Sequence, residues 1–328
     1  MKLLVTGGLG FIGSNFILKI LQNYNDFTVT NVDACLYGSN EANLVDIKNN
    51  SNYKFVEGNI TNYNLMDKLI SECEAIINFA AESFVDRSIQ DSKPFFESNV
   101  QGVFTILNII KRRKKRLIHI STDEVFGSLK TSSASEYTKL NPSSPYAATK
   151  AAAEILLNSF VITYDCDCLI TRCTNNYGPR QFPEKLIPKT IFLALQNKKI
   201  PVYGTGQNIR DWIFVNDHCD AILKVLIDGK SGESYNISAN NEVDNLTIVK
   251  KILSIMKKPH DLIEFVEDRP GHDFRYSLDS SKIRNELNWL PKTNFEDGLE
   301  KTISWYLSNN YWQKAIHEKT LTSTPWKN

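Results

Sequence analysis

The amino-acid sequence predicts an α/β fold, with a doubly wound parallel sheet followed by a smaller C-terminal domain of mixed α/β structure. In the first half of the chain, short apolar runs alternate with amphipathic segments whose apolar residues recur at helical spacing. Such short runs are typical of parallel strands that are buried on both faces. After about residue 174 the alternation gives way to an irregular pattern in which Gly and Pro recur. This change predicts the boundary between two domains.

Each predicted element follows from its own residues. Strands are expected where apolar and β-branched residues run together, at residues 3–7, 27–32, 53–56, 75–81, 116–121 and 168–173. Helices are expected where apolar residues recur at helical spacing, at residues 12–23, 65–70, 95–110, 146–164, 185–197, 216–228, 246–257 and 295–307. Because strands alternate with helices in the first half, the sheet is predicted to be parallel, with helices on both faces.

Composition and charge exclude several classes of protein. The 328 residues are 42% hydrophobic and 23% charged, which is typical of a globular protein and excludes a disordered chain. Lys and Arg number 38 against 37 Asp and Glu, so the net charge of +1 predicts neither a nucleic acid nor an anionic membrane as a partner. The one basic run, residues 111–116, ends a predicted helix and is interpreted as solvated. No apolar run approaches the roughly 18–20 residues that a membrane span needs.

The cysteines and the N-terminal residues favour a reducing compartment. Six cysteines are scattered without CxxC spacing, so we expect neither a zinc site nor a disulfide scaffold. The first residues are typical of a strand that runs into a glycine turn, and they lack the features of a signal peptide. We therefore expect a cytoplasmic protein that binds no metal ion.

A glycine turn joins the first predicted strand to the first predicted helix. Gly7, Gly10 and Gly13 follow GxxGxxG spacing, which allows a tight turn, close approach of a pyrophosphate, and close packing of helix on sheet. The helix N-terminus would then offer its free N–H groups to the phosphates. Asp33 lies 20 residues beyond Gly13, where a carboxylate can bind an adenosine ribose and would repel a 2′-phosphate. The alternative is a glycine turn without a ligand; the combination favours NAD.

A second motif places a tyrosine and a lysine on one helical face. Tyr146 and Lys150 are four residues apart in a predicted helix, so their side chains are neighbours. A lysine ammonium near the phenol would lower the tyrosine pKa, so that the phenolate could take a proton from an alcohol as hydride leaves. Alone, this spacing also suits an ordinary surface helix. Thr122, at the end of the preceding strand, strengthens the catalytic interpretation, because the carboxyl ends of parallel strands form the ligand crevice.

An acidic pair follows Thr122 directly. Asp123 and Glu124 stand at this predicted strand end, and a simple dehydrogenase would need neither. An elimination needs one group to remove a carbon-bound proton and another to protonate a leaving hydroxyl. The alternative for such a pair is a solvated loop.

These motifs together resemble the dTDP-glucose 4,6-dehydratases, within the extended short-chain dehydrogenase/reductase superfamily. The similar segments span nearly the whole chain: VTGGLGFIGS (5–14), FAAESFVDRSI (79–89), STDEVFG (121–127), PSSPYAATKAAAE (142–154), NNYGPRQFPEKLIP (175–188), YGTGQNIRDWIFVNDH (203–218), YNIS (235–238) and DRPGHDFRY (268–276). UDP-galactose 4-epimerases resemble the chain in the glycine turn and the Tyr-Lys spacing, but typically lack the acidic pair. The resemblance implies a Rossmann-type sheet and a tightly held NAD.

The resemblance also implies a reaction cycle. Tyr146 would take the C4 hydroxyl proton as hydride passes to NAD, and Thr122 would orient that hydroxyl. Glu124 would then remove H5 while Asp123 protonates the leaving C6 hydroxyl. Hydride would finally return to C6, giving the 4-keto-6-deoxy sugar nucleotide.

Further residues are implied by the same resemblance. Those expected to bind NAD, beside the glycines and Asp33, are Phe11, Ile12, Asn59, Ile60, Ala80, Ala81, Ser98, Tyr146, Lys150 and Asn176. Those expected to bind the sugar nucleotide, beside the Thr122-Asp123-Glu124 triplet, are Ser83, Asn175, Lys185, Leu186, Pro201, Tyr203, Arg210, Asn245, Arg269 and His272. Arginine suits this position because a guanidinium can bind diphosphate oxygens bidentately. Asn59, Phe126 and Ser238 depart from the usual aspartate, tyrosine and glycine of the family.

The domain and partner predictions follow. We expect an NAD-binding domain at residues 1–174, to which residues 208–230 return, and a sugar-nucleotide-binding domain at residues 175–207 and 231–328. A homodimer is expected by analogy with the superfamily. The substrate is expected to be dTDP-glucose; the alternatives are a UDP-glucose 4,6-dehydratase, a sugar-nucleotide 4-epimerase, and a catalytically silent NAD-binding regulator.

Overall fold

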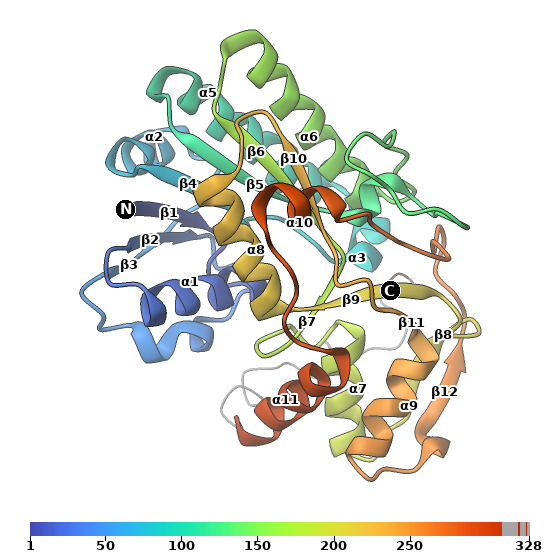
Figure 1. The fold of residues 1–328 in the computed structure, drawn as a ribbon. Helices are drawn as coiled ribbons and strands as arrows, with labels where there is room; N and C mark the ends of the chain where they lie inside the picture. Colours follow the sequence, from blue (N-terminus) through green and yellow to red (C-terminus); the bar gives the residue numbers. More distant parts are fainter. Residues whose placement is uncertain (310–320, 322–325, 327–328) are drawn as a thin grey trace.

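A parallel sheet between two layers of helices forms the larger part of the molecule (Figure 1). The computed structural model describes residues 1–309, 321 and 326. Within these residues the main sheet has seven strands in the order β10-β6-β5-β4-β1-β2-β3, and every pairing is parallel. Its strands are β1 (Lys2–Thr6), β2 (Thr28–Asp33), β3 (Tyr53–Glu57), β4 (Ala75–Asn78), β5 (Arg116–Thr122), β6 (Cys168–Cys173) and β10 (Ser234–Ile237). The predicted doubly wound α/β fold is confirmed.

Successive side chains of the buried strands point alternately into two separate hydrophobic cores. Leu3 and Val5 of β1 pack with α1 (Phe11–Asn23), α8 (Val215–Asp228) and α10 (Ser281–Leu287). Leu4, between them, points to the other face and packs with α2 (Tyr63–Glu72), α5 (Val103–Arg113) and α6 (Pro145–Tyr164). This period of two explains why the strands are apolar throughout, because both faces of the sheet are covered.

The second lobe is smaller and mixed. It holds a three-stranded sheet of β7 (Asn175–Tyr177), β9 (Ile209–Phe214) and β11 (Glu242–Asp244), and the parallel pair β8 (Ile200–Tyr203) and β12 (Ile263–Val266). Its helices are α7 (Leu186–Leu195), α9 (Asn245–Ile255) and α11 (Phe295–Ser308), which lie together in Figure 1. Tyr177 and Trp212 are buried in the core of this lobe.

Several elements differ from the sequence predictions. The predicted helix at 95–110 is divided into α4 (Lys93–Phe96), a π-helical segment η2 (Glu97–Gly102) and α5. Residues 231–237 were expected in the second domain, but β10 pairs with β6 and extends the main sheet. Short elements that lack a clear period were not predicted: α3 (Val85–Gln90), the 3-10 helices η1 (Glu41–Ile47), η3 (Asp123–Phe126) and η4 (His260–Leu262), and the strands of the second lobe.

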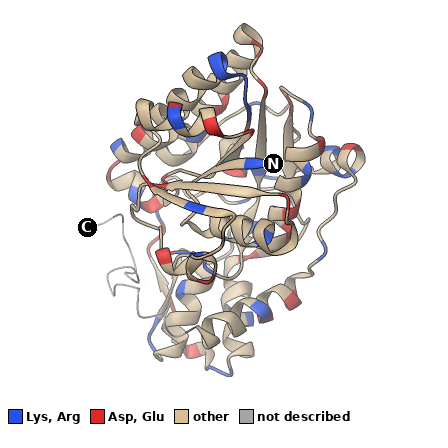
Figure 2. Ribbon diagram, turned by 90° about the vertical axis from the view of Figure 1, so that its left-hand side faces the viewer, with Lys and Arg blue, Asp and Glu red and all other residues tan. Residues whose placement is uncertain are grey.

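Charged residues of both signs are interspersed along the chain (Figure 2). The basic run at the end of α5 is partly neutralised, because Arg113 pairs with Asp67 at 2.9 Å and Arg116 pairs with Asp167 at 2.9 Å. None of the helices in the described ranges has both the length and the apolar character that crossing a membrane requires. Residues 112–114 of the run are exposed, which agrees with its interpretation as a solvated helix end.

Candidate active site

One cleft collects residues from the carboxyl ends of β1, β2, β4, β5 and β6 and from the start of the second lobe. Every residue that the sequence analysis assigned to the cofactor lines it: Gly7, Gly10, Phe11, Ile12, Gly13, Asp33, Asn59, Ile60, Ala80, Ala81, Ser98, Tyr146, Lys150 and Asn176. The acidic pair, Thr122, Ser83, Asn175 and Lys185 line the same cleft. Open α/β sheets bind their ligands at this end of the strands.

The glycine turn leaves bare backbone at the floor of the cleft. Gly7 has a φ of +70°, and a Cβ there would lie 2.6 Å from the backbone nitrogen of Ala80. A Cβ on Gly13 would lie 2.5 Å from the carbonyl oxygen of Gly7. Both positions therefore require glycine, and α1 begins directly after Gly10 without a side-chain cap. The uncapped N–H groups of α1 fit a pyrophosphate.

Asp33 is held firmly at the end of β2. Its two carboxylate oxygens accept hydrogen bonds from the backbone N–H groups of Leu9 and Cys35, both at 2.9 Å. Burial raises the pKa of Asp33, while these two hydrogen bonds oppose the rise. A fixed carboxylate beside the glycine turn fits the ribose hydroxyls of NAD and disfavours a 2′-phosphate. The residues present therefore fit this dinucleotide.

The acidic pair lies in the single turn η3 that follows β5. The Thr122 hydroxyl donates to Asp123 Oδ1 at 3.1 Å and accepts from the Glu124 backbone N–H at 3.3 Å. Asp123 Oδ2 is buried without a partner among the described residues. Burial, and then the charge of Glu124, raise the pKa of Asp123 to about 8. A carboxyl in this position keeps its proton at neutral pH, so it can act as an acid.

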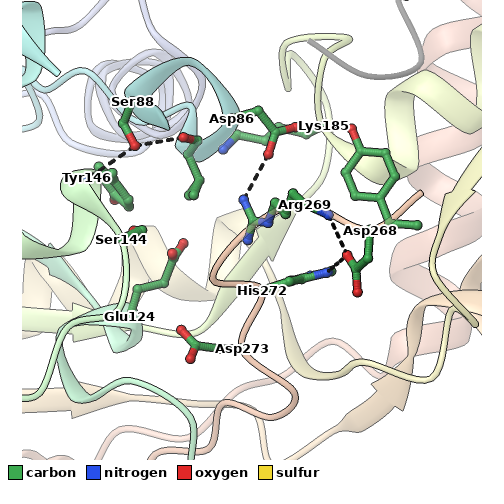
Figure 3. A network of polar contacts seen from close by, with 12 residues as sticks. Asp86, Ser88, Glu124, Ser144, Tyr146, Lys185, Asp268, Arg269, His272 and Asp273 are labelled. Carbon is green, nitrogen blue, oxygen red and sulfur yellow. Dashed lines mark hydrogen bonds and ion pairs between the residues drawn. The ribbon is translucent and has the colours of Figure 1, made fainter. Parts of the chain in front are cut away.

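Tyr146 lies in the first turn of α6. Ser144 caps the helix by accepting from the Ala147 backbone N–H at 3.2 Å, and Pro145 occupies its first position. The Ser88 hydroxyl accepts from the Tyr146 backbone N–H at 3.2 Å, as Figure 3 shows. These contacts aim the phenol into the cleft beside Thr122.

One electrostatic expectation was wrong. We expected Lys150 to lower the pKa of Tyr146, but burial and then the charge of Glu124 raise this pKa well above its ordinary value. The Lys150 ammonium instead donates to the Ile120 carbonyl at 2.6 Å and lies 3.3 Å from His119 Nε2. Burial also lowers the pKa of Lys150 to about 8. A side-chain hydrogen bond with Thr122 lowers the pKa of Tyr146, but by less than burial and the charge of Glu124 raise it.

Three cations face the acidic pair from the second lobe. Arg269, Lys185 and Arg210 each lower the pKa of Glu124, against a larger rise that burial causes. Lys185 donates to the Ser83 carbonyl at 2.8 Å. Figure 3 shows Arg269 directed at Asp86 of α3, with Arg269 Nη1 3.0 Å from Asp86 Oδ1. Such a group of cations suits a diphosphate.

The remaining residues assigned to the sugar nucleotide lie outside the lining of the cleft. The Tyr203 hydroxyl donates to Asp86 Oδ2 at 3.0 Å, and His272 Nδ1 lies 2.5 Å from Asp268 Oδ1. Asp86 accepts from Tyr203 through Oδ2 and from Arg269 through Oδ1, so its carboxylate connects these two residues. Leu186, Pro201 and Asn245 are also outside this lining, at or near the starts of α7, β8 and α9.

Several residues of the site were not predicted from the sequence. Asp86 lies within the segment 79–89, but its pairing with Arg269 of the second lobe could not be predicted from the sequence. His119 is fully buried behind Lys150, and its Nδ1 lies 3.1 Å from Asn78 Nδ2. The Tyr276 hydroxyl lies 3.5 Å from Glu124 Oε2, although the two residues are 152 positions apart in the sequence. A signal was present for Tyr276 and Asp86, since both belong to family-like segments.

Comparison with known proteins identifies the family of this chain. A family model described as GDP-mannose 4,6 dehydratase matches residues 4–302. A dTDP-glucose 4,6-dehydratase of Mycobacterium tuberculosis is 43% identical over 324 residues, which cover 98% of this chain and 97% of the relative. This chain belongs to the dTDP-glucose 4,6-dehydratase family.

Other members and neighbours of the family are similar over the full length. The low-salt glycan biosynthesis protein Agl12 of Haloferax volcanii is 47% identical over 311 residues, 94% of this chain and 100% of that protein. A crystal structure of the dTDP-glucose 4,6-dehydratase from Streptomyces venezuelae, with NAD bound, has a TM-score of 0.93 and 42% identity, covering 95% of this chain and 98% of the other. A UDP-glucuronic acid 4-epimerase from Bacillus cereus shares the fold at a TM-score of 0.89 but only 28% identity, covering 94% and 99%.

Proposed function

We propose that this chain dehydrates dTDP-glucose to the 4-keto-6-deoxy sugar nucleotide. The observation that carries the proposal is the pair Asp123 and Glu124, held at the end of β5 in the same cleft as Tyr146. A dehydrogenase or an epimerase needs the tyrosine alone, whereas loss of water needs an acid and a base in addition. The chain's family supports the same reaction.

The cofactor of this reaction is NAD. When bound, it accepts a hydride from C4 of the sugar and returns one to C6, so the net reaction is that of a lyase. The glycine turn, Asp33 and the uncapped start of α1 would hold its pyrophosphate and adenosine ribose. Lys150 would bind its second ribose from the floor of the cleft, and the other lining residues named above would surround it.

Tyr146 and Thr122 serve the oxidation of C4. Tyr146 removes the hydroxyl proton at C4, and the Thr122 hydroxyl orients that group. Because the pKa of Tyr146 is raised by burial and by Glu124, a positive charge must compensate before the phenol can act as a base. Lys150, one helical turn from Tyr146 on α6 and in the lining of the same cleft, would supply that charge when the cofactor is bound.

Asp123 and Glu124 serve the elimination. The ketone at C4 acidifies H5, and Glu124 removes that proton. Asp123 protonates the C6 hydroxyl, which leaves as water; its pKa of about 8 keeps the required proton in place at neutral pH. Glu124 later returns a proton to C5. The three cations Lys185, Arg210 and Arg269 favour an ionised Glu124 and would bind the diphosphate.

The remaining assignments are proposals on the same footing. Ser83, Asn175, Leu186, Pro201, Tyr203, Asn245 and His272 are proposed to complete the nucleotide and sugar site. The NAD domain is proposed to comprise residues 1–174, joined by α8 and β10 rather than by all of residues 208–230, because β9 pairs with β7 and β11 of the second lobe. The substrate domain is proposed to comprise the rest of the chain. The pairing of β10 with β6 supports this revised boundary.

Two further properties are proposed. A homodimer is supported by exposed apolar side chains on neighbouring helices: Phe96, Phe104, Ile155 and Ile162 are 57%, 45%, 61% and 85% exposed. Pairing of these helices with a second copy would cover them. A cytoplasmic location is supported by the six free cysteines, of which five are buried.

The test is a parallel assay of dTDP-glucose and UDP-glucose with product masses measured. We expect a product one water lighter than the substrate, and faster turnover of dTDP-glucose. Faster turnover of UDP-glucose would favour the uridine alternative; thymine and uracil differ by one methyl group, which pockets discriminate by only about 1–3 kcal/mol. A product of unchanged mass would indicate an epimerase, and no product would indicate a silent NAD-binding protein.

A further inference from the structure

Tyr276 places one buried hydroxyl between two carboxylates. It is only 3% exposed, and its hydroxyl lies 2.7 Å from Asp273 Oδ2 and 3.5 Å from Glu124 Oε2. Burial, and then the charge of Glu124, raise its pKa well above the ordinary value, so the phenol keeps its proton at neutral pH. One hydroxyl can therefore donate to Asp273 while it accepts from Glu124 once that group is protonated.

The contacts continue from Asp273 to the surface. The Ser143 hydroxyl donates to Asp273 Oδ2, the same oxygen that accepts from Tyr276. Ser143 is exposed, whereas Asp273 is only 8% exposed. Glu124, Tyr276, Asp273 and Ser143 thus form a continuous series of hydrogen-bonding groups between the acidic pair and solvent.

Arg210 fixes the middle of this series. Its guanidinium carbon lies 4.3 Å from the centroid of the Tyr276 ring, and its Nη2 donates to the Asp273 carbonyl at 2.9 Å. Stacking and hydrogen bonding by one buried arginine hold both residues in register. The longest link is the 3.5 Å between Tyr276 and Glu124, and catalytic hydrogen bonds in ligand-free structures often tighten when substrate binds.

The cleft side of Glu124 is where the sugar nucleotide would sit. Glu124 lines the cleft together with Lys185, and Arg269 interacts with its charge from the second lobe. A bound substrate would displace water from that side, and among the described residues the Tyr276 hydroxyl is the group within hydrogen-bond distance of the carboxylate. Any exchange of the Glu124 proton during the reaction would then have to use the Tyr276 side.

We propose that Tyr276, Asp273 and Ser143 connect Glu124 to solvent, so that the proton taken from C5 exchanges while the sugar remains bound. The inference rests on the proposed function. The C5–H bond breaks, its electron pair stays on the sugar as an enolate, and the proton goes to Glu124. Glu124 passes it to the Tyr276 oxygen as Tyr276 gives its own proton to Asp273, which releases one to water at Ser143. The reverse flow returns a solvent proton to C5, with no change in charge or oxidation state.

The test is a single turnover of unlabelled substrate in D₂O, with deuterium located in the product by NMR or fragment mass spectrometry. We expect wild-type product to carry deuterium at C5 and none at C6, since the C6 hydrogen comes from C4. In Tyr276→Phe the series is broken, so the same proton returns and the deuterium fraction at C5 should fall about tenfold; loss of one acid/base group typically slows proton transfer by 10²–10⁴. Asp273→Asn should give the same loss.

A matched variant and three outcomes decide the proposal. Tyr235→Phe removes the hydroxyl of another buried tyrosine, which lies in β10 and accepts a hydrogen bond from the Lys230 backbone N–H. This variant should leave the deuterium fraction at C5 unchanged. Wild-type deuterium at C5 in both Tyr276→Phe and Asp273→Asn would overturn the path, and so would its absence from wild-type product. If Tyr276→Phe fails to bind NAD, Asp273→Asn decides alone. Failure to form any dehydrated product with wild-type protein would instead refute the proposed function.

Discussion

Replacing Asp123 by asparagine should stabilise the folded chain at neutral pH while it impairs the reaction. Burial and the charge of Glu124 raise the pKa of Asp123 from 3.8 to about 8. In the unfolded chain this carboxyl ionises above 3.8, but in the folded chain it stays protonated until about pH 8, so wild-type stability falls as pH rises between these values. At about 1.4 kcal/mol for each tenfold change in ionisation, the cost at pH 7 is about 4 kcal/mol. Asparagine has no such cost, because it does not ionise.

The assay is equilibrium unfolding in urea at pH 5 and pH 7, with NAD at saturation. The advantage of Asp123→Asn over wild type should grow by about 3 kcal/mol between the two pH values. Asp46→Asn, a change of an exposed carboxylate in η1, is the matched control and should follow the wild-type pH dependence. If Asp123→Asn and wild type lost stability in parallel, Asp123 would not be protonated in the folded chain, and its assignment as the acid would lose its physical basis.

Three further outcomes are expected. Product formation should decline as pH rises through about 8, because Asp123 then loses the proton that the leaving hydroxyl needs; a rate that stays level to pH 10 would argue against this. Gly13→Ala should abolish co-purification of NAD, because the added Cβ would lie 2.5 Å from the Gly7 carbonyl oxygen. NAD released by denaturation is measured, and a full NAD content would show that the glycine turn can accommodate the methyl group. Ile162→Asp, at a side chain 85% exposed on α6, should convert a dimer to a monomer in light scattering without loss of NAD, whereas an unchanged mass would place the interface elsewhere.

Local patterns predicted the main sheet because its elements are long and regular. The apolar runs of β1, β5 and β6 and the helical period of α6 and α8 are properties of contiguous residues. The place of β10 was not predictable in this way, because pairing with β6 joins segments about 60 residues apart and leaves no mark on either one. Strands as short as β7 and β11 are below the length at which a period of two can be recognised.

The site was predictable in its parts but not in its electrostatics. The spacing of Tyr146 and Lys150 correctly puts both on the cleft side of α6, yet the ammonium donates to the Ile120 carbonyl rather than acting directly on the phenol. Burial dominates the pKa of Tyr146, and burial is a property of the folded chain alone. The contact of Arg269 with Asp86 joins residues 183 positions apart, so it too exists only after folding.

The division of labour between Tyr146 and Glu124 is tested most directly by a single turnover after rapid mixing, with reduced nicotinamide followed by absorbance and quenched products identified by mass. Glu124→Gln leaves Tyr146, Lys150 and Thr122 in place, so oxidation at C4 should proceed while elimination fails. This variant should accumulate reduced nicotinamide and a 4-keto sugar that has not lost water. Tyr146→Phe should accumulate neither, because the first step is blocked. Wild-type turnover by Glu124→Gln, or reduced nicotinamide in Tyr146→Phe and none in Glu124→Gln, would contradict the assigned roles.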